Sequence, residues 1–339
     1  GVGDWVRLLG AFAQARRTDP ALMAEAGEAL GMAEGASAEP LSAAGAEDVA
    51  QLVLAVDALS PAGMTSLFSA ALERIRELEQ DQGSGGGLSS GSVARLAGAF
   101  ARSQLRWDGM LSWLAPPGDG ARLPDLEDGS VAELAFACHT WGMSDRGDLD
   151  WLVSLAAAAA RRCDGRKLSK LLLFLGQARS WNAAAQAAFG HALQVRLPLL
   201  LAPAVRRGGS ELPEDAVPHL LEALALARER DLSVILSLSG RCLSLAQRLD
   251  AEPLLSIATS LERLRVRQER LLIEVADNLV VRHQRALGPA DIEAALRAFT
   301  ALRVPHASLA DLARRCLEKW AGSQDVTRLQ AALQGFEAV

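Results

Sequence analysis

Apolar residues recur at spacings of three and four through most of this chain, which is the pattern of amphipathic helices. The clearest example lies between Asp291 and Leu317, where the sequence reads DIEAALRAFTALRVPHASLADLARRCL. The apolar stripe continues to Leu302, is interrupted at Val304-Pro305-His306, and resumes at Leu309. Because a proline disfavours helical geometry in the residue before it, the interruption predicts a turn between two helices. The segment is therefore predicted to be a helical hairpin.

The same hairpin recurs along nearly the whole chain. Each copy is marked here by a ruler residue, the apolar residue that follows a small one near the end of its first helix: Phe12, Val56, Phe100, Cys138, Leu175, Leu224, Leu261, Phe299 and Phe336. Successive ruler residues lie 44, 44, 38, 37, 49, 37, 38 and 37 residues apart, and the longer spacings contain insertions. A fixed period of this length is typical of repeat architectures.

Each hairpin has one apolar face per helix and cannot bury it alone, so neighbouring hairpins must stack. The sequence predicts an all-α fold, an α-solenoid of about eight stacked helix-turn-helix repeats with a 37–38-residue period. Strand signals are missing, since the chain has no Tyr and no sustained period-two alternation. The insertion at 203–215, which reads PAVRRGGSELPED, is predicted to be a hinge within one continuous solenoid.

The net charge of −6 is divided unevenly between the two halves. Residues 1–150 hold 10 Arg, no Lys and 22 Asp plus Glu, a net charge of −12, whereas residues 151–339 hold 25 basic and 19 acidic residues, a net charge of +6. The first half is predicted to contain acidic, irregular repeats that face protein partners. The second half is predicted to contain basic, more regular repeats that a polyanion would prefer.

Arginine supplies 32 of the 35 basic residues. It suits bidentate contact with phosphate, although a GC-rich genome also enriches arginine together with alanine and glycine. Charge composition by itself leaves these two explanations open.

No catalytic constellation is found in the sequence. The five histidines lack metal-ligand spacing, and neither GxSxG, HExxH nor a phosphate loop ending in Lys-Ser/Thr is present. The cysteines show no CxxC spacing and lie within helical patterns, so buried reduced thiols are predicted at Cys138, Cys163, Cys242 and Cys316. We therefore expect no enzymatic activity, no cofactor and no metal site. No apolar run reaches membrane-spanning length, so membrane insertion is not expected either.

One arrangement of basic residues follows the repeat. Four residues past the ruler position stand Arg16, Arg179, Arg228, Arg265 and Arg303. Stacking would align these side chains as a ladder, which is predicted to follow the phosphate backbone of an RNA. The alternative is that an arginine at a helix C-terminus interacts with the helix dipole and the last carbonyls. Near the same turn, Trp107 and Trp181 are predicted either to stack on bases or to pack between helices.

Two segments carry a resemblance to a known group of proteins. LERLRVRQERLLIEVADNL (Leu261 to Leu279) and LRAFTALRVPHASLADLARRCL (Leu296 to Leu317) resemble the helical repeats of organellar RNA-binding proteins. These are the heptatricopeptide and octotricopeptide families and the repeats that precede RAP domains in FAST-kinase-like proteins. The resemblance covers seven or eight units and is strongest from Ala216 onward.

The resemblance implies an α-solenoid in an organelle, with the mitochondrion favoured over the plastid, that acts on organellar transcripts or belongs to an organellar ribosome. No RAP-type domain lies within these residues, so nuclease-like activity is not implied. A targeting segment is not expected within the chain, which begins at Gly1.

Two hypotheses about function follow. In the first, the chain is a non-catalytic RNA-binding protein that holds single-stranded or ribosomal RNA with residues 151–339. In the second, it is a scaffold subunit of a large organellar assembly and makes little direct RNA contact.

Overall fold

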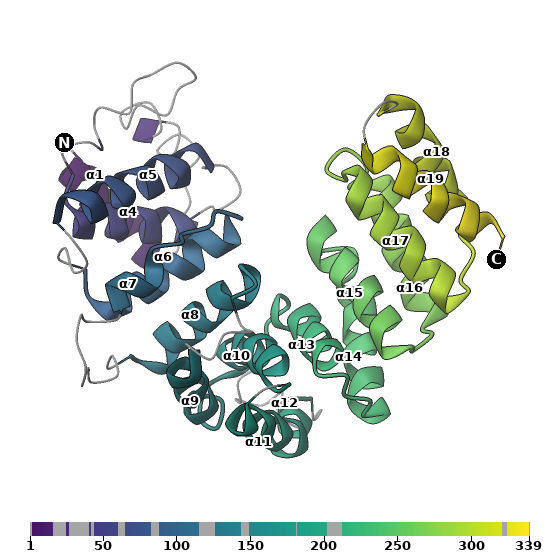
Figure 1. The fold of residues 1–339 in the computed structure, drawn as a ribbon, viewed down its shortest axis with the longest axis horizontal. Coiled ribbons are helices and arrows are strands. Elements are labelled where there is room, and N and C mark those ends of the chain that lie inside the picture. Colours follow the sequence, from purple (N-terminus) through teal and green to yellow (C-terminus); the bar gives the residue numbers. More distant parts are fainter. Residues whose placement is uncertain are drawn as a thin grey trace. The chain divides into compact units, whose positions relative to one another are not determined.

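The computed structural model describes residues 2–15, 25–26, 41, 44–59, 65–82, 88–114, 126–143, 149–180, 182–201, 212–320 and 324–338. These ranges form helices and short connections without a strand (Figure 1). The chain divides into two compact units, Gly1–Ala156 and Ala157–Val339. The predicted all-α, solenoid-like fold is confirmed in the described residues.

The first unit is organised around a row of first helices, each of which packs against the next. In chain order these are α1 (Val2–Gln14), α4 (Ala46–Leu59), α6 (Ser90–Arg102) and α8 (Asp128–Thr140). The second helices described in this part of the chain are α5 (Thr65–Gln82), α7 (Met110–Leu114) and α9 (Asp150–Ala159), the last of which extends past the boundary of the unit. Helix α5 packs on α4 and α7 packs on α6, as expected for hairpins.

The second unit repeats this plan more regularly. Its first helices pack in sequence and are α10 (Gly165–Ala178), α13 (Ala216–Leu226), α15 (Ala251–Leu264), α17 (Pro289–Leu302) and α19 (Gln324–Glu337). The second helices form the other layer: α11 (Ala183–His191), which continues through the π-helical turn η3 (Ala192–Arg196) into α12 (Leu197–Leu201), then α14 (Leu232–Leu245), α16 (Glu269–Val281) and α18 (Ala307–Lys319). Helices α12, α14, α16 and α18 each contact the next.

The repeat register read from the sequence is the register of the core. Eight of the nine ruler residues are buried, and Phe12 is half-buried. Within each unit the first helices pack against one another in sequence, so the buried ruler residues lie in the layer that joins one repeat to the next. The predicted break at Val304-Pro305-His306 is also confirmed, because α17 ends at Leu302 and α18 begins at Ala307.

The cysteine prediction is confirmed as well. All four cysteines are buried, and none of them forms a disulfide. Burial raises the pKa of Cys138 to about 12, and burial likewise raises the pKa of Cys242 to about 12. These side chains therefore stay as neutral thiols and act as small apolar core residues.

Two further expectations concern the chain as a whole. The predicted hinge at 203–215 lies mostly outside the described residues, and α10 and α13 on its two sides pack directly against each other. Among the described helices, none has the length and apolar character needed to cross a membrane.

Candidate nucleic-acid interface

The ladder arginines of the second unit occupy a special backbone position. Arg228, Arg265 and Arg303 have φ angles of 53°, 56° and 54°, in the left-handed region. Each lies one or two residues past the end of a first helix. In the first unit the same position is taken by Gln104 (φ 57°) and by Gly142 (φ 66°).

The hydrogen bonds at these sites define a Schellman motif, in which two backbone N–H groups close the last helical turn. At the end of α15, the Val266 N–H donates to the Leu261 carbonyl over 3.0 Å, and the Arg265 N–H donates to the Glu262 carbonyl over 2.9 Å. Equivalent pairs follow Arg228 and Arg303, and also Gln104 and Gly142. The four-residue offset from the ruler residue is therefore set by the way each first helix ends.

This position would normally favour glycine. A left-handed conformation costs an L-residue about 1–2 kcal/mol, and glycine avoids that cost. Favourable interaction of a cation with an exposed helix C-terminus returns about 0.3–1 kcal/mol. The dipole interaction therefore does not by itself explain why arginine stands at three consecutive repeats, whereas the chain uses glycine at Gly142.

The three side chains are directed to solvent. Arg228, Arg265 and Arg303 are exposed, and none forms a hydrogen bond or ion pair through its guanidinium within the described part of the chain. Because α13, α15 and α17 pack in sequence, these turns follow one edge of the second unit. We call this surface the arginine edge and define it as Arg228, Arg230, Arg265, Arg267 and Arg303.

The carboxylates in these turns are engaged in local contacts. Glu229 receives a hydrogen bond from Arg179, and Glu269 pairs with Arg267 over 3.0 Å. Asp231 caps α14 by accepting hydrogen bonds from the Ser233 and Val234 N–H groups. The Ser233 hydroxyl and these backbone donors hold the pKa of Asp231 below its usual value. Glu229 and Glu269 are thus paired with Arg179 and Arg267, whereas Asp231 stays ionised beside Arg230. Arg228, Arg265 and Arg303 form no ion pair within the described ranges.

Arg179 differs from Arg228, Arg265 and Arg303 in its backbone conformation and in its contacts. Its φ of −54° continues the helical conformation past α10. Its Nη1 lies 2.6 Å from Glu229 Oε2, and its guanidinium stands 5.8 Å from the centroid of the Phe189 ring. Arg179 is half-buried between these groups, and its ion pair with Glu229 links two repeats.

Of the two tryptophans predicted either to stack on bases or to pack between helices, the structure describes Trp107. Trp107 is fully buried, where its ring packs edge-on against Phe100 and Trp113, and its Nε1 donates to Glu79 Oε1 over 3.1 Å. The base-stacking interpretation of Trp107 is therefore wrong, and the packing alternative is confirmed. Arg16 and Trp181 lie outside the described residues.

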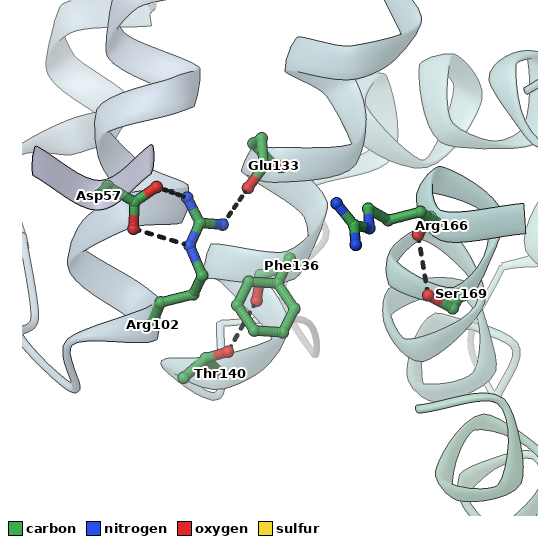
Figure 2. Close-up of polar contacts among 7 residues, drawn as sticks. All are labelled: Asp57, Arg102, Glu133, Phe136, Thr140, Arg166 and Ser169. Carbon is green, nitrogen blue, oxygen red and sulfur yellow. Dashed lines mark hydrogen bonds and ion pairs between the residues drawn. The ribbon is translucent and has the colours of Figure 1, made fainter. Parts of the chain in front are cut away.

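Sequence reasoning missed an ion triad in the first unit, shown in Figure 2. Arg102 of α6 forms a fork on Asp57 of α4, with Nε–Oδ1 and Nη2–Oδ2 distances of 3.1 and 2.6 Å. Its Nη1 reaches Glu133 Oε2 of α8 over 2.6 Å. Burial opposes the charged guanidinium, but the bonds to Asp57 and the charge of Glu133 outweigh it and raise the pKa of Arg102 above its usual value. The triad fastens three successive first helices together.

A glycine makes room for this triad. A Cβ placed on Gly98 would lie 2.2 Å from Glu133 Oε2 and 2.9 Å from Glu133 Cβ. Any larger residue at Gly98 would displace Glu133 from Arg102. The sequence signal was present as a glycine within the α6 stripe, but its partner lies on another repeat.

The two units use their arginines differently. In the first unit, Arg95 bonds only a backbone carbonyl, whereas each of the other described arginines lies within 4.0 Å of a carboxylate: Arg7, Arg74, Arg76, Arg102 and Arg106. In the second unit, Arg228, Arg230, Arg265 and Arg303 form no ion pair among the described residues, although other arginines there do pair with carboxylates: Arg166, Arg179, Arg248, Arg267, Arg297 and Arg314. The charge difference between the halves is thus also a difference in how far the cations are neutralised.

Comparison with known proteins adds no family to these observations: no protein-family model and no curated protein matches the chain. Within the ranges that the structure describes, no group of three or more His, Cys, Asp or Glu residues is placed to hold a metal ion.

Proposed function

We propose that this chain is a non-catalytic RNA-binding helical-repeat protein whose arginine edge contacts the phosphate backbone of single-stranded or ribosomal RNA. The observation that carries the proposal is the use of arginine at Arg228, Arg265 and Arg303, where the backbone favours glycine. A charged residue at a conformationally costly position is reasonable if its exposed side chain binds a ligand, here the phosphate groups of RNA.

The composition of the edge favours backbone contacts over base recognition. Arginine binds phosphate oxygens with a planar, bidentate fork. The turns 227–231, 265–268 and 303–306 contain no Trp or Phe on which a base would stack. Phosphate contacts fix the position of an RNA without reading its sequence. The proposed activity is therefore binding with little base preference.

The biological setting enters this proposal through the resemblance of Leu261–Leu279 and Leu296–Leu317 to organellar RNA-binding repeats. On that basis the RNA is an organellar transcript or a ribosomal RNA, and the mitochondrion is favoured over the plastid.

A second candidate function is a protein-interaction scaffold. The observation that favours it is the first unit, where a net charge of −12 over residues 1–150 is combined with arginines that are already paired to carboxylates. Such a unit repels RNA and suits a basic protein partner. The two functions are compatible, since they use different units.

The test is binding of the full chain to a fluorescein-labelled single-stranded RNA of about 20 nucleotides, long enough to span several repeats. One variant carries Arg228→Gln, Arg265→Gln and Arg303→Gln, and a matched variant carries Lys at the same three sites. Glutamine is accepted at this backbone position in Gln104, so the fold is expected to persist.

The proposal predicts at least a tenfold loss of affinity in the glutamine variant and a smaller loss in the lysine variant, which keeps the charge. Homopolymers of A, U and C should bind with similar affinity. Equal binding of the wild type and the glutamine variant would refute a role for the edge and leave the scaffold function.

A further inference from the structure

Glu229 departs from a pattern that other helix ends keep. In the Schellman motif at the end of α13, the Glu229 N–H donates to the carbonyl of the ruler residue Leu224 over 2.9 Å. The residue that makes this bond frequently packs an apolar side chain against the last turn of the helix. The other described first helices with the same bond have an apolar residue there: Leu105, Met143, Val266 and Val304. A half-buried carboxylate in this place needs a partner, because a charge is costly to remove from water unless it is paired.

The partner of Glu229 is Arg179, which stands at the end of the preceding first helix, α10. Their side chains are 28% exposed for Arg179 and 33% exposed for Glu229, and the ion pair is 2.6 Å long. No further polar partner of either side chain occurs within the described ranges. Arg179 has a helical backbone at the ladder position, so the pair joins two helix ends that both depart from the common pattern.

Arg179 changes the charge of the turn that it contacts. In residues 227–232 two arginines and two carboxylates cancel to a formal charge of zero: Arg228, Glu229, Arg230 and Asp231. The equivalent residues of the next two repeats, 265–269 and 303–307, each have a formal charge of +1 when histidine is neutral. Arg179 raises the first turn to +1 as well. All three turns of the arginine edge are then positive, which favours contact with phosphate.

Building on the proposed RNA-binding function, we propose that Arg179 is a positioning residue that supports phosphate contact by holding Glu229 in an ion pair. Glu229 lies between Arg228 and Arg230 in the sequence. With Arg179 in place, the carboxylate is neutralised from the preceding repeat, and these two guanidinium groups are left for phosphate oxygens. Without Arg179, the carboxylate is an unpaired anion that attracts both arginines and repels RNA. Arg179 thus acts through Glu229 and without touching the RNA.

The experiment measures binding of the full chain to the fluorescein-labelled single-stranded RNA across a salt series. Arg179→Met removes the charge and keeps an unbranched side chain beside the Phe189 ring. Arg179→Met/Glu229→Val removes both charges, and Glu229→Val alone leaves Arg179 in place. Valine is native at the equivalent Val266 and Val304, so it is expected to be accepted at this helix end. Circular dichroism would check the fold of each variant.

The matched control is Arg248→Met. Arg248 pairs with Glu214 over 2.7 Å and follows the end of α14 that is opposite to turn 227–232. This substitution changes the net charge of the chain as Arg179→Met does, but it frees a carboxylate away from the arginine edge. The control therefore separates a local effect at the edge from the effect of overall charge.

Arg179→Met should weaken RNA binding about fivefold, because the freed carboxylate then repels phosphate at the edge. It should also make the slope of log affinity against log salt concentration shallower by about 0.7, the contribution of one phosphate contact. Adding Glu229→Val should restore both values to those of the wild type. Glu229→Val alone should bind at least as tightly as the wild type, and this variant decides the question if Arg179→Met does not fold. Arg248→Met should leave the affinity unchanged.

A loss of affinity that Glu229→Val does not restore would mean that Arg179 contacts the RNA itself, and it would overturn the proposal. Equal losses in Arg179→Met and Arg248→Met, or no loss in Arg179→Met, would overturn it too. The variant with glutamine at Arg228, Arg265 and Arg303 separates this inference from the proposed function. If that variant binds RNA as the wild type does, both fail; if it loses affinity while Arg179→Met does not, the inference about Arg179 fails alone.

Discussion

The backbone conformations at Arg265 and Arg179 predict that glycine and alanine have opposite orders of stability at these two positions. At Arg265 the backbone is left-handed (φ 56°), whereas at Arg179 it is helical (φ −54°). We compare Gly with Ala at each site. Both substitutions remove the guanidinium, so the difference between them isolates the backbone.

The magnitudes follow from the two conformations. At Arg265, alanine bears the cost of the left-handed conformation, about 1–2 kcal/mol, and glycine does not. Glycine instead bears an entropic cost of about 0.5–1 kcal/mol, because its unfolded chain is more flexible. Glycine is therefore expected to be more stable than alanine there by about 0.5–1 kcal/mol. At Arg179, alanine is expected to be more stable than glycine by about 1 kcal/mol, because glycine is unfavourable in helical geometry.

The assay is urea unfolding of the four variants, followed by circular dichroism at 222 nm, with amide hydrogen exchange at the ends of α15 and α10 as a local measure. Hydrogen exchange is needed because a repeat protein can open locally before it unfolds globally. The same order of Gly and Ala at both sites would refute the assignment of Arg265 to a left-handed cap.

Three further predictions concern local interactions. Arg102→Met should destabilise the first unit by about 2 kcal/mol because it leaves Asp57 and Glu133 half-buried without their cation, and an additional Asp57→Asn substitution should recover part of that loss in urea unfolding. Cys138 and Cys242 should resist a disulfide reagent at pH 8 in the folded chain and react once it is unfolded in urea, since their pKa values of about 12 leave little thiolate; rapid reaction of the native protein would contradict their burial. Asp231→Ala should cost about 1 kcal/mol at neutral pH through loss of the α14 cap. Because the pKa of Asp231 is lowered in the folded state, this contribution is complete above the ordinary value of 3.8 and is lost as the pH falls through the folded value, so the wild type and the variant should converge in strong acid; a difference that persists there would contradict it.

The repeat architecture could be predicted because it depends on a short-range pattern. Apolar spacing of three and four fixes which face of each helix is buried, and this pattern placed Phe100, Leu224 and Phe299 correctly in the core. The turn at Val304-Pro305 is equally local, since proline restricts the residue before it.

The spacing of the arginines indicated the ladder, but it did not indicate the left-handed helix ends that place them there. A glycine after a helix would have indicated a left-handed cap, whereas arginine concealed it at Arg228, Arg265 and Arg303. Arg179 has the same offset in sequence, yet its contacts with Glu229 and Phe189 lie on other helices and could not be read from neighbouring residues.

Trp107 and the Arg102 triad likewise depend on contacts between residues that are distant in the sequence. Trp107 stands near a turn in the sequence, but its burial depends on Phe100, Trp113 and Glu79 from three different elements. The Arg102 triad joins residues 45 and 31 positions away, and no periodic signal distinguishes such carboxylates from those on a solvated face.

The most direct test of the central claim is the salt dependence of RNA binding by the full chain. Each phosphate contact with a single strand contributes about 0.7 to the slope of log affinity against log salt concentration. Replacement of Arg228, Arg265 and Arg303 by glutamine should therefore make the slope shallower by about 2, while lysine at the same sites should preserve it. An unchanged slope in the glutamine variant would contradict the account, because the arginine edge would then make no phosphate contact.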